Sequence, residues 1–160
     1  APIFDLVREK LNTANCHLQI VNLIEITRQA LIENFLPKTK IAVLSALGTK
    51  QQQLYSRPLA QQGFEVVEQD TEWHNKVHQA IYDPVYGIKA QSSPVSKQAV
   101  LELQKAMDEL IEQGAQAILL GCTELPLAFS QKEYRGIPLL DPNRILARKL
   151  IEAYAPDKLK

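Results

Sequence analysis

Residues 115–124 read AQAILLGCTE, and this stretch combines a short, mostly apolar run with polar side chains at its end. The run over 115–120 follows Gly114, a residue type that commonly ends helices, and it stops at a second glycine. A short apolar run between two turn signals is typical of a strand buried on both faces of a parallel sheet. The sequence therefore predicts a buried β-strand whose carboxyl end carries a cysteine, a threonine and a glutamate at positions 122–124.

Other strands and helices alternate around this strand. Strands are predicted at residues 41–46, 64–67 and 137–140, and helices at 51–62, at 71–82, between Pro94 and Gly114, and at 143–154. Alternating strands and helices build a parallel sheet that is covered on both faces. The predicted fold class is therefore α/β, with a Rossmann-like parallel sheet.

The N-terminal residues continue the pattern with weaker signals. Residues 1–11 are predicted to form a helix, with Pro2 at a position that the first helical turn tolerates. A strand at 18–21 and a helix at 25–35 follow, and Leu36-Pro37 marks a break. These elements could belong to the same sheet or to a neighbouring domain. A helix at the very start of the chain also suggests that an upstream portion is missing.

Composition limits the class of protein. The 160 residues are long enough for a substantial core, 46% of them are hydrophobic, and 18 basic and 18 acidic side chains give a formal net charge of zero. This balance argues against disorder and against binding of nucleic acid, and it favours a small neutral ligand or a locally neutralised anion. Apolar runs are far shorter than a membrane span and no signal peptide is evident, so no membrane contact is expected.

The two cysteines, Cys16 and Cys122, are far apart and show no CxxC spacing, so we expect neither a disulfide framework nor a metal site, and a reducing cytoplasm fits. His74 and His78 have the spacing of metal ligands on a helix, but a third ligand is not evident near them, which favours packed or solvated histidines. Lys89 lies in a predicted loop, where it is a solvated charge unless the loop converges on a binding site.

Polar side chains follow several predicted strands. They stand at Gly48-Thr49, at 121–124 and at 141–143, and the carboxyl ends of parallel strands meet at one edge of a sheet, where ligands bind. Cys122 is the best candidate for a nucleophile or base, because local N–H groups at such an edge can lower the pKa of a thiol. The alternative is that Cys122 simply fills the end of the strand, as free cysteines often do.

Several motifs together resemble the C-terminal half of the aspartate/glutamate racemase family, most closely its aspartate racemase branch. They are AILLGCTELPL at 117–127, IPLLDP at 137–142, IAVL at 41–44 with Gly48-Thr49, and YGIKA at 86–90. The resemblance covers essentially all of the chain. Glutamate racemases usually have histidine where this chain has Glu124.

The resemblance implies racemisation without a cofactor, in which two thiols on opposite faces of the substrate exchange the α-proton. Cys122 matches one of these acid/bases. Lys89 matches a lysine that binds the distal carboxylate of a dicarboxylic amino acid, Thr49 lies where contacts to the α-carboxylate are usual, and Thr123 and Glu124 match residues that bind or polarise the substrate or orient the thiol. The family also suggests a homodimer.

In this family the first thiol belongs to a Cys-Asn-Thr-Ala-His motif, which would lie immediately before residue 1. Residues 12–15 read NTAN, but Leu11 stands where that cysteine would be. We therefore expect residues 1–37 to be the C-terminal part of an incomplete first α/β domain, 38–140 to be a second α/β domain, and 141–160 to pack back on the first. The isolated chain is then expected to lack turnover.

Other functions remain open on the sequence. The chain could belong to another enzyme of the superfamily, such as a hydantoin racemase or a maleate isomerase. It could also be a carboxylate-binding protein that does no catalysis.

Overall fold

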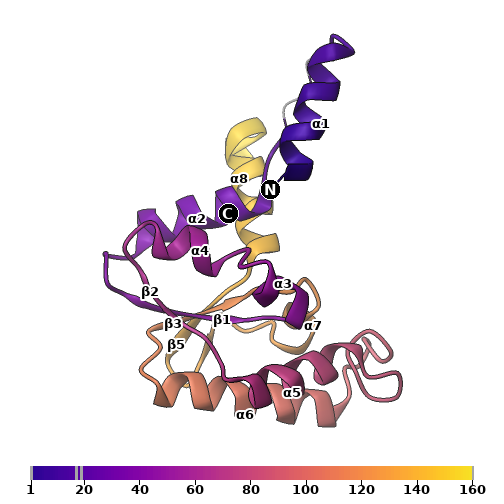
Figure 1. Ribbon diagram of the computed structural model, residues 1–160, viewed down its shortest axis with the longest axis vertical. Helices are drawn as coiled ribbons and strands as arrows, with labels where there is room; N and C mark the ends of the chain where they lie inside the picture. Colours follow the sequence, from indigo (N-terminus) through magenta and orange to yellow (C-terminus); the bar gives the residue numbers. More distant parts are fainter. Residues whose placement is uncertain (1, 17, 19, 160) are drawn as a thin grey trace.

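A five-stranded sheet with the order β2-β1-β3-β5-β4 lies at the centre of the computed structural model, which describes residues 2–16, 18 and 20–159 (Figure 1). The strands are β1 (Lys40–Leu44), β2 (Glu65–Val67), β3 (Ala117–Leu120), β4 (Glu133–Tyr134) and β5 (Ile137–Leu140). The pairs β2-β1, β1-β3 and β3-β5 are parallel, whereas the two-residue β4 runs antiparallel to β5 at one edge. The α/β prediction is confirmed, and the antiparallel edge strand is an addition to it.

Helices cover both faces of this sheet (Figure 1). They are α1 (Pro2–Thr13), α2 (Leu23–Asn34), α3 (Leu47–Gln51), α4 (Ser56–Ala60), α5 (Thr71–Tyr82), α6 (Lys97–Glu112), α7 (Leu125–Ala128) and α8 (Pro142–Tyr154), followed by the 3₁₀ turn η1 (Pro156–Lys158). Alternate strand residues face the two sides. Ala42 and Ile118 pack with α5 and α6, while Ile41 and Leu119 pack with α2 and α4.

The register brings the carboxyl ends of three strands level with one another. Leu44 of β1 pairs with Leu120 of β3, and Leu140 of β5 pairs with Leu119. The backbone N–H of Gly121 continues this pairing, because it donates to the carbonyl oxygen of Leu44 at 2.8 Å. The residues that follow β1, β3 and β5 therefore meet at one edge of the sheet.

Two predicted elements are wrong. The helix expected at 51–62 is interrupted between α3 and α4, because Gln53 adopts a left-handed conformation with φ 48° that a helix cannot continue through. Of the strand expected at 18–21, Leu18, Ile20 and Val21 lie in neither a helix nor a strand, and the position between them, 19, lies outside the described residues.

Most other boundaries agree with the sequence. The predicted helix at 71–82 and the predicted strand at 137–140 are confirmed, and the segment after Pro94 becomes helical only at Lys97, where the Ser96 side chain caps the helix by accepting from the backbone N–H of Ala99. Gly48, which follows the predicted strand at 41–46, lies in the first turn of α3.

The two ends of the chain differ in their packing. In Figure 1, α1 projects away from the sheet, whereas α8 lies against α2, where Lys149 pairs with Glu33 at 3.1 Å. The division of the chain into residues 1–37, 38–140 and 141–160 stays a prediction. Within the described part of the chain, each helix is too short or too polar to cross a membrane.

Candidate functional site

Cys122 lies just past the carboxyl end of β3, on the sheet edge that β1 and β5 also reach. The residue before Cys122 is Gly121, and the end of the neighbouring strand β1 passes so close to it that a side chain there would be crowded. A Cβ at Gly121 would stand 3.1 Å from the Cβ of Ser45 and 3.3 Å from the carbonyl oxygen of Leu44. The Cys122 side chain itself is half-buried, so it combines a packed position with access from the edge of the sheet.

Glu124 is the hydrogen-bond partner of this thiol. The Sγ atom of Cys122 donates to Oε2 of Glu124 at 3.0 Å, and the hydroxyl of Thr123 donates to the same oxygen at 3.1 Å. The three consecutive residues thus form one hydrogen-bonded group directly after the strand. A role for Glu124 in orienting the thiol, one of the alternatives that the sequence left open, stays a prediction.

Lys89 reaches this group from a different part of the chain. Its Nζ atom lies 2.5 Å from Oε1 of Glu124, so the ammonium and the thiol occupy the two oxygens of one carboxylate. The Lys89 side chain is 45% exposed and that of Glu124 is 17% exposed. The ammonium therefore remains accessible to a ligand, while the carboxylate is largely enclosed.

The loop that carries Lys89 is fixed to the end of α5. The backbone N–H of Ile88 donates to the carbonyl of Ala80 at 2.9 Å, and that of Lys89 donates to the carbonyl of Ile81 at 3.0 Å. The Ile88 side chain is fully buried in the core. Gly87 makes the tight turn possible, since a Cβ there would stand 2.6 Å from backbone atoms of Asp83.

The structure brings together four of the five site residues predicted from the sequence. These are Lys89, Cys122, Thr123 and Glu124. Thr49 instead lies half-buried in α3, and within the described part of the chain no hydrogen bond joins its side chain to the other four. Its backbone N–H donates to the carbonyl of Ala46 at 3.1 Å.

The charges in this cluster shift the pKa values of its members in opposite directions. Burial, together with the hydrogen bond and negative charge of Glu124, raises the pKa of the Cys122 thiol to about 11. Burial on its own would raise the pKa of Glu124, but the hydrogen bonds from Lys89 and Cys122 outweigh it and lower that pKa to about 2. At neutral pH the resting site therefore holds a protonated thiol beside an ionised carboxylate.

Two tyrosines near this cluster were not predicted as site residues. Tyr55 shares with Cys122 and Asn143 a small cavity of about 30 Å³, enough for roughly one water molecule. Burial, and then the negative charge available at Cys122 and Asp141, raises the pKa of Tyr55 to about 12, so its hydroxyl stays protonated. In the sequence Tyr55 shows only as one apolar position of a predicted helix.

Tyr82 is the second tyrosine. It is the last residue of α5, and the Nζ atom of Lys89 lies 5.0 Å from the centroid of its ring. On the same helix, the ring of His78 stacks on Tyr82 with a centroid separation of 4.7 Å and an interplanar angle of 25°.

His74 lies one turn before His78 in α5 and is buried, with 2% of its surface exposed. Among the described residues, no three His, Cys, Asp or Glu side chains gather closely enough to hold a metal ion.

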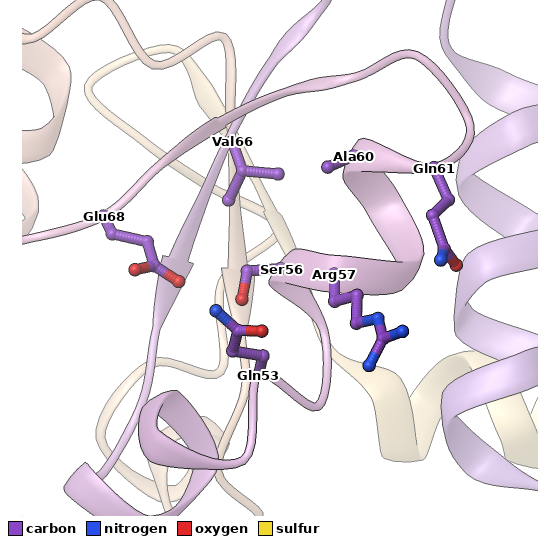
Figure 2. Close-up of a pocket in the computed structure, with 7 residues that line it drawn as sticks. All are labelled: Gln53, Ser56, Arg57, Ala60, Gln61, Val66 and Glu68. Atoms are coloured by element: carbon purple, nitrogen blue, oxygen red, sulfur yellow. The ribbon is translucent and has the colours of Figure 1, made fainter.

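A larger hollow in the surface lies elsewhere. It has a volume of about 630 Å³ and is open to solvent beside α4 and the edge strand β2, where Arg57 and Glu68 are among its lining residues (Figure 2). None of the five predicted site residues lines it. We therefore place the candidate site at the carboxyl end of β3, where reactive and charged groups converge.

Known proteins share this architecture. An aspartate racemase from Picrophilus torridus superposes with a TM-score of 0.69 at 22% identity, over 86% of this chain and 54% of that chain. An aspartate racemase homologue from Pyrococcus horikoshii OT3 gives a TM-score of 0.66 at 24% identity, over 94% of this chain and 61% of that chain. The chain thus spans little more than half the length of these two solved structures, and at such identities the similarity establishes the fold.

Sequence comparison identifies the family of the chain as well as its fold. An uncharacterized protein in the pnlA 3′ region of Pectobacterium carotovorum subsp. carotovorum is 28% identical over 141 residues, which are 87% of this chain and 87% of that protein. The sequence model of the Asp/Glu/Hydantoin racemase family matches residues 1–150. A match over this much of the chain shows that it belongs to the Asp/Glu/Hydantoin racemase family.

Proposed function

We propose that this chain carries one side of the active site of a cofactor-independent racemase that acts on aspartate or glutamate, with Cys122 as one of two acid/bases. The observation that carries the proposal is the shared carboxylate of Glu124, which binds the Cys122 thiol through one oxygen and the Lys89 ammonium through the other. Family membership and the racemase fold support an isomerase.

The protonation state of the cluster suggests how Cys122 begins a turnover. Its raised pKa, about 11, keeps the thiol protonated, so Cys122 starts as the proton donor. A base on the opposite face of the substrate breaks the Cα–H bond, and the electron pair passes into the α-carboxylate. The S–H proton of Cys122 then moves to Cα from the other face and leaves a thiolate, which takes up a proton when the reaction runs in reverse.

The thiolate formed at Cys122 lies beside the negatively charged carboxylate of Glu124, so its charge needs stabilisation from other groups. Backbone hydrogen bonds from Glu124 and Ala46 favour the thiolate form, although burial and the carboxylate outweigh them in the resting site. Because the pKa of Glu124 is about 2 and that of Cys122 about 11, the carboxylate accepts the thiol hydrogen bond without taking its proton.

Lys89 is proposed to bind the distal carboxylate of the substrate. Its side chain is 45% exposed and its ammonium already pairs with a carboxylate, which is the chemistry that such a ligand requires. A bound substrate would share this ammonium with Glu124 or replace Glu124 on it. Thr49 and Thr123 remain proposed substrate contacts.

The experiment incubates the full-length protein, not the isolated 160 residues, in deuterated water with aspartate and, separately, with glutamate. Proton NMR follows the incorporation of deuterium at Cα. We expect exchange of both enantiomers in the wild type, loss of exchange for at least one enantiomer in Cys122→Ala, and unchanged exchange in the matched control Cys16→Ala, which removes the other free cysteine. Wild-type exchange of both enantiomers in Cys122→Ala would overturn the role of this thiol, and turnover only of a hydantoin, or only of maleate to fumarate, would reassign the substrate.

One observation favours a second candidate, a carboxylate-binding protein without catalysis. The thiol is held protonated, with its pKa raised to about 11, and a catalytic base needs the opposite tendency. This candidate predicts that aspartate raises the thermal unfolding temperature while the α-proton does not exchange. Exchange at the α-carbon in the intact protein excludes it.

A further inference from the structure

The backbone of Lys89 is held firmly, but the backbone alone does not place its ammonium. Hydrogen bonds from the N–H groups of Ile88 and Lys89 to the carbonyls of Ala80 and Ile81 fasten the loop to the end of α5. The Lys89 side chain, however, has four rotatable bonds and is 45% exposed. Something besides the loop has to keep Nζ close to Glu124.

Tyr82 is in the right place to do this. It directly follows Ile81, the residue whose carbonyl anchors the backbone of Lys89, and its ring centroid lies 5.0 Å from the Lys89 ammonium. That separation is within the range of a cation–π interaction. The ring is itself supported, since the imidazole of His78 stacks on it one turn earlier in α5.

The exposure of Tyr82 argues against a purely structural role. The residue is 47% exposed, so its ring is not part of the core, and the ring contacts His78 and Lys89. A neutral ring attracts an ammonium without competing for the place of an anion. It can therefore hold Lys89 in position while Glu124 gives way to a carboxylate ligand.

We propose that Tyr82 is a positioning residue, whose ring, supported by His78, holds the Lys89 ammonium beside Glu124 and so places it for the distal carboxylate of a dicarboxylic substrate. The statement about the substrate rests on the proposed function. The statement about the ammonium does not, because it concerns only the side chains of Tyr82, His78 and Lys89.

The first test is spectroscopic and uses the intact protein without substrate. An aromatic ring beside the ammonium shifts the NMR signals of the Lys89 side-chain methylene protons, which are assigned by comparison with Lys89→Arg. We expect Tyr82→Phe to keep this shift and Tyr82→Leu to lose it. Lys76, whose Nζ lies 4.3 Å from the ring centroid of Trp73 on the same helix, is the internal control and its signals should not move in either variant.

The second test separates binding from chemistry. For a dicarboxylic substrate, Tyr82→Leu should raise KM about two- to fivefold, the effect of losing one exposed cation–π contact, with kcat unchanged. Tyr82→Phe should restore the wild-type KM, because it keeps the ring and loses only the hydroxyl. A merely structural role would instead lower the unfolding temperature in Tyr82→Leu and leave the KM for the dicarboxylic substrate unchanged.

The outcomes are distinguishable. Unchanged Lys89 signals in Tyr82→Leu, or a Tyr82→Phe variant that behaves like Tyr82→Leu, overturns the inference. Loss of the ring-induced shift in Tyr82→Leu, in a protein whose wild type exchanges no α-proton, supports the positioning of Lys89 and overturns the proposed racemase function instead.

Discussion

The thiol of Cys122 and the carboxylate of Glu124 form a hydrogen-bonded pair, with Sγ 3.0 Å from Oε2. The two residues are separated by Thr123 alone, so the pair forms within the first turn of chain after β3. Because an ionised carboxylate beside a thiol disfavours the thiolate, each group affects the titration of the other.

Removing the charge of Glu124 should make Cys122 more reactive. In Glu124→Gln the side chain keeps its shape but loses its negative charge, so the pKa of Cys122 should fall from about 11. Each unit of that fall gives about tenfold more thiolate at pH 8. The rate of alkylation by iodoacetamide against pH measures it, in a Cys16→Ala background so that Cys122 alone reports. An unchanged pH profile would contradict the coupling.

Removing the ammonium of Lys89 should raise the pKa of Glu124. In Lys89→Met the carboxylate loses its cation while burial continues to oppose ionisation, so the pKa of Glu124 should rise from about 2. Titration of its side-chain carboxyl ¹³C signal measures the change. Lys76→Met, which breaks the exposed pair with Glu72, is the matched control and should leave the titration of Glu124 where it is. A wild-type titration of Glu124 in Lys89→Met would show that the ion pair does not persist in solution.

Some residues of this cluster could be predicted from the sequence and others could not. Residues 122–124 adjoin one another, so their proximity follows from the chain itself, and Lys89 entered through the resemblance of residues 86–90 to a known loop. Tyr82 was visible only as the end of a predicted helix. Hydrophobic periodicity tells which face of a helix is buried, but it does not tell which distant side chain a residue touches.

The fold was predictable where local signals and packing agree. The helix at 71–82 begins after Asp70, whose side chain accepts from the backbone N–H of Trp73, and it ends before Asp83-Pro84. The interruption of the helix expected at 51–62 has no such signal, since a glutamine at position 53 takes the left-handed conformation that glycine usually adopts. Strand β4 has two residues, too few for an alternating pattern.

A methyl group at Gly87 should disturb the loop that carries Lys89. In Gly87→Ala the Cβ would stand 2.6 Å from backbone atoms of Asp83, which a fixed turn cannot accommodate without moving. We expect a loss of about 1–3 kcal/mol in the free energy of unfolding, the usual cost of overpacking. Gly48→Ala is the matched control: nothing lies within 4 Å of its Cβ position, and alanine favours the helical conformation of α3.

Urea unfolding of both glycine variants measures the difference. Gly48→Ala should be as stable as the wild type or more stable by up to about 1 kcal/mol. Equal stability of Gly87→Ala and the wild type would show that the turn relaxes freely.

The raised pKa of Cys122 also predicts how stability depends on alkaline pH. The folded protein holds the thiol proton up to a pKa of about 11, whereas the usual value in an unfolded chain is near 9. The folded state therefore binds more protons than the unfolded state between these values, and its stability should fall as pH rises through this window. Below pH 9 this contribution is fully present, and it is lost as the pH passes about 11.

Other groups also titrate in this range, so the prediction concerns a difference between two proteins. Urea unfolding at several pH values between 7 and 11 is compared for Cys16→Ala and for Cys16→Ala/Cys122→Ala. The free energy of unfolding should fall more steeply above pH 9 in the protein that keeps Cys122, because only there must a buried thiol ionise beside the Glu124 carboxylate. Parallel curves would mean that the thiol titrates alike in the folded and unfolded states, and that neither burial nor Glu124 raises its pKa in solution.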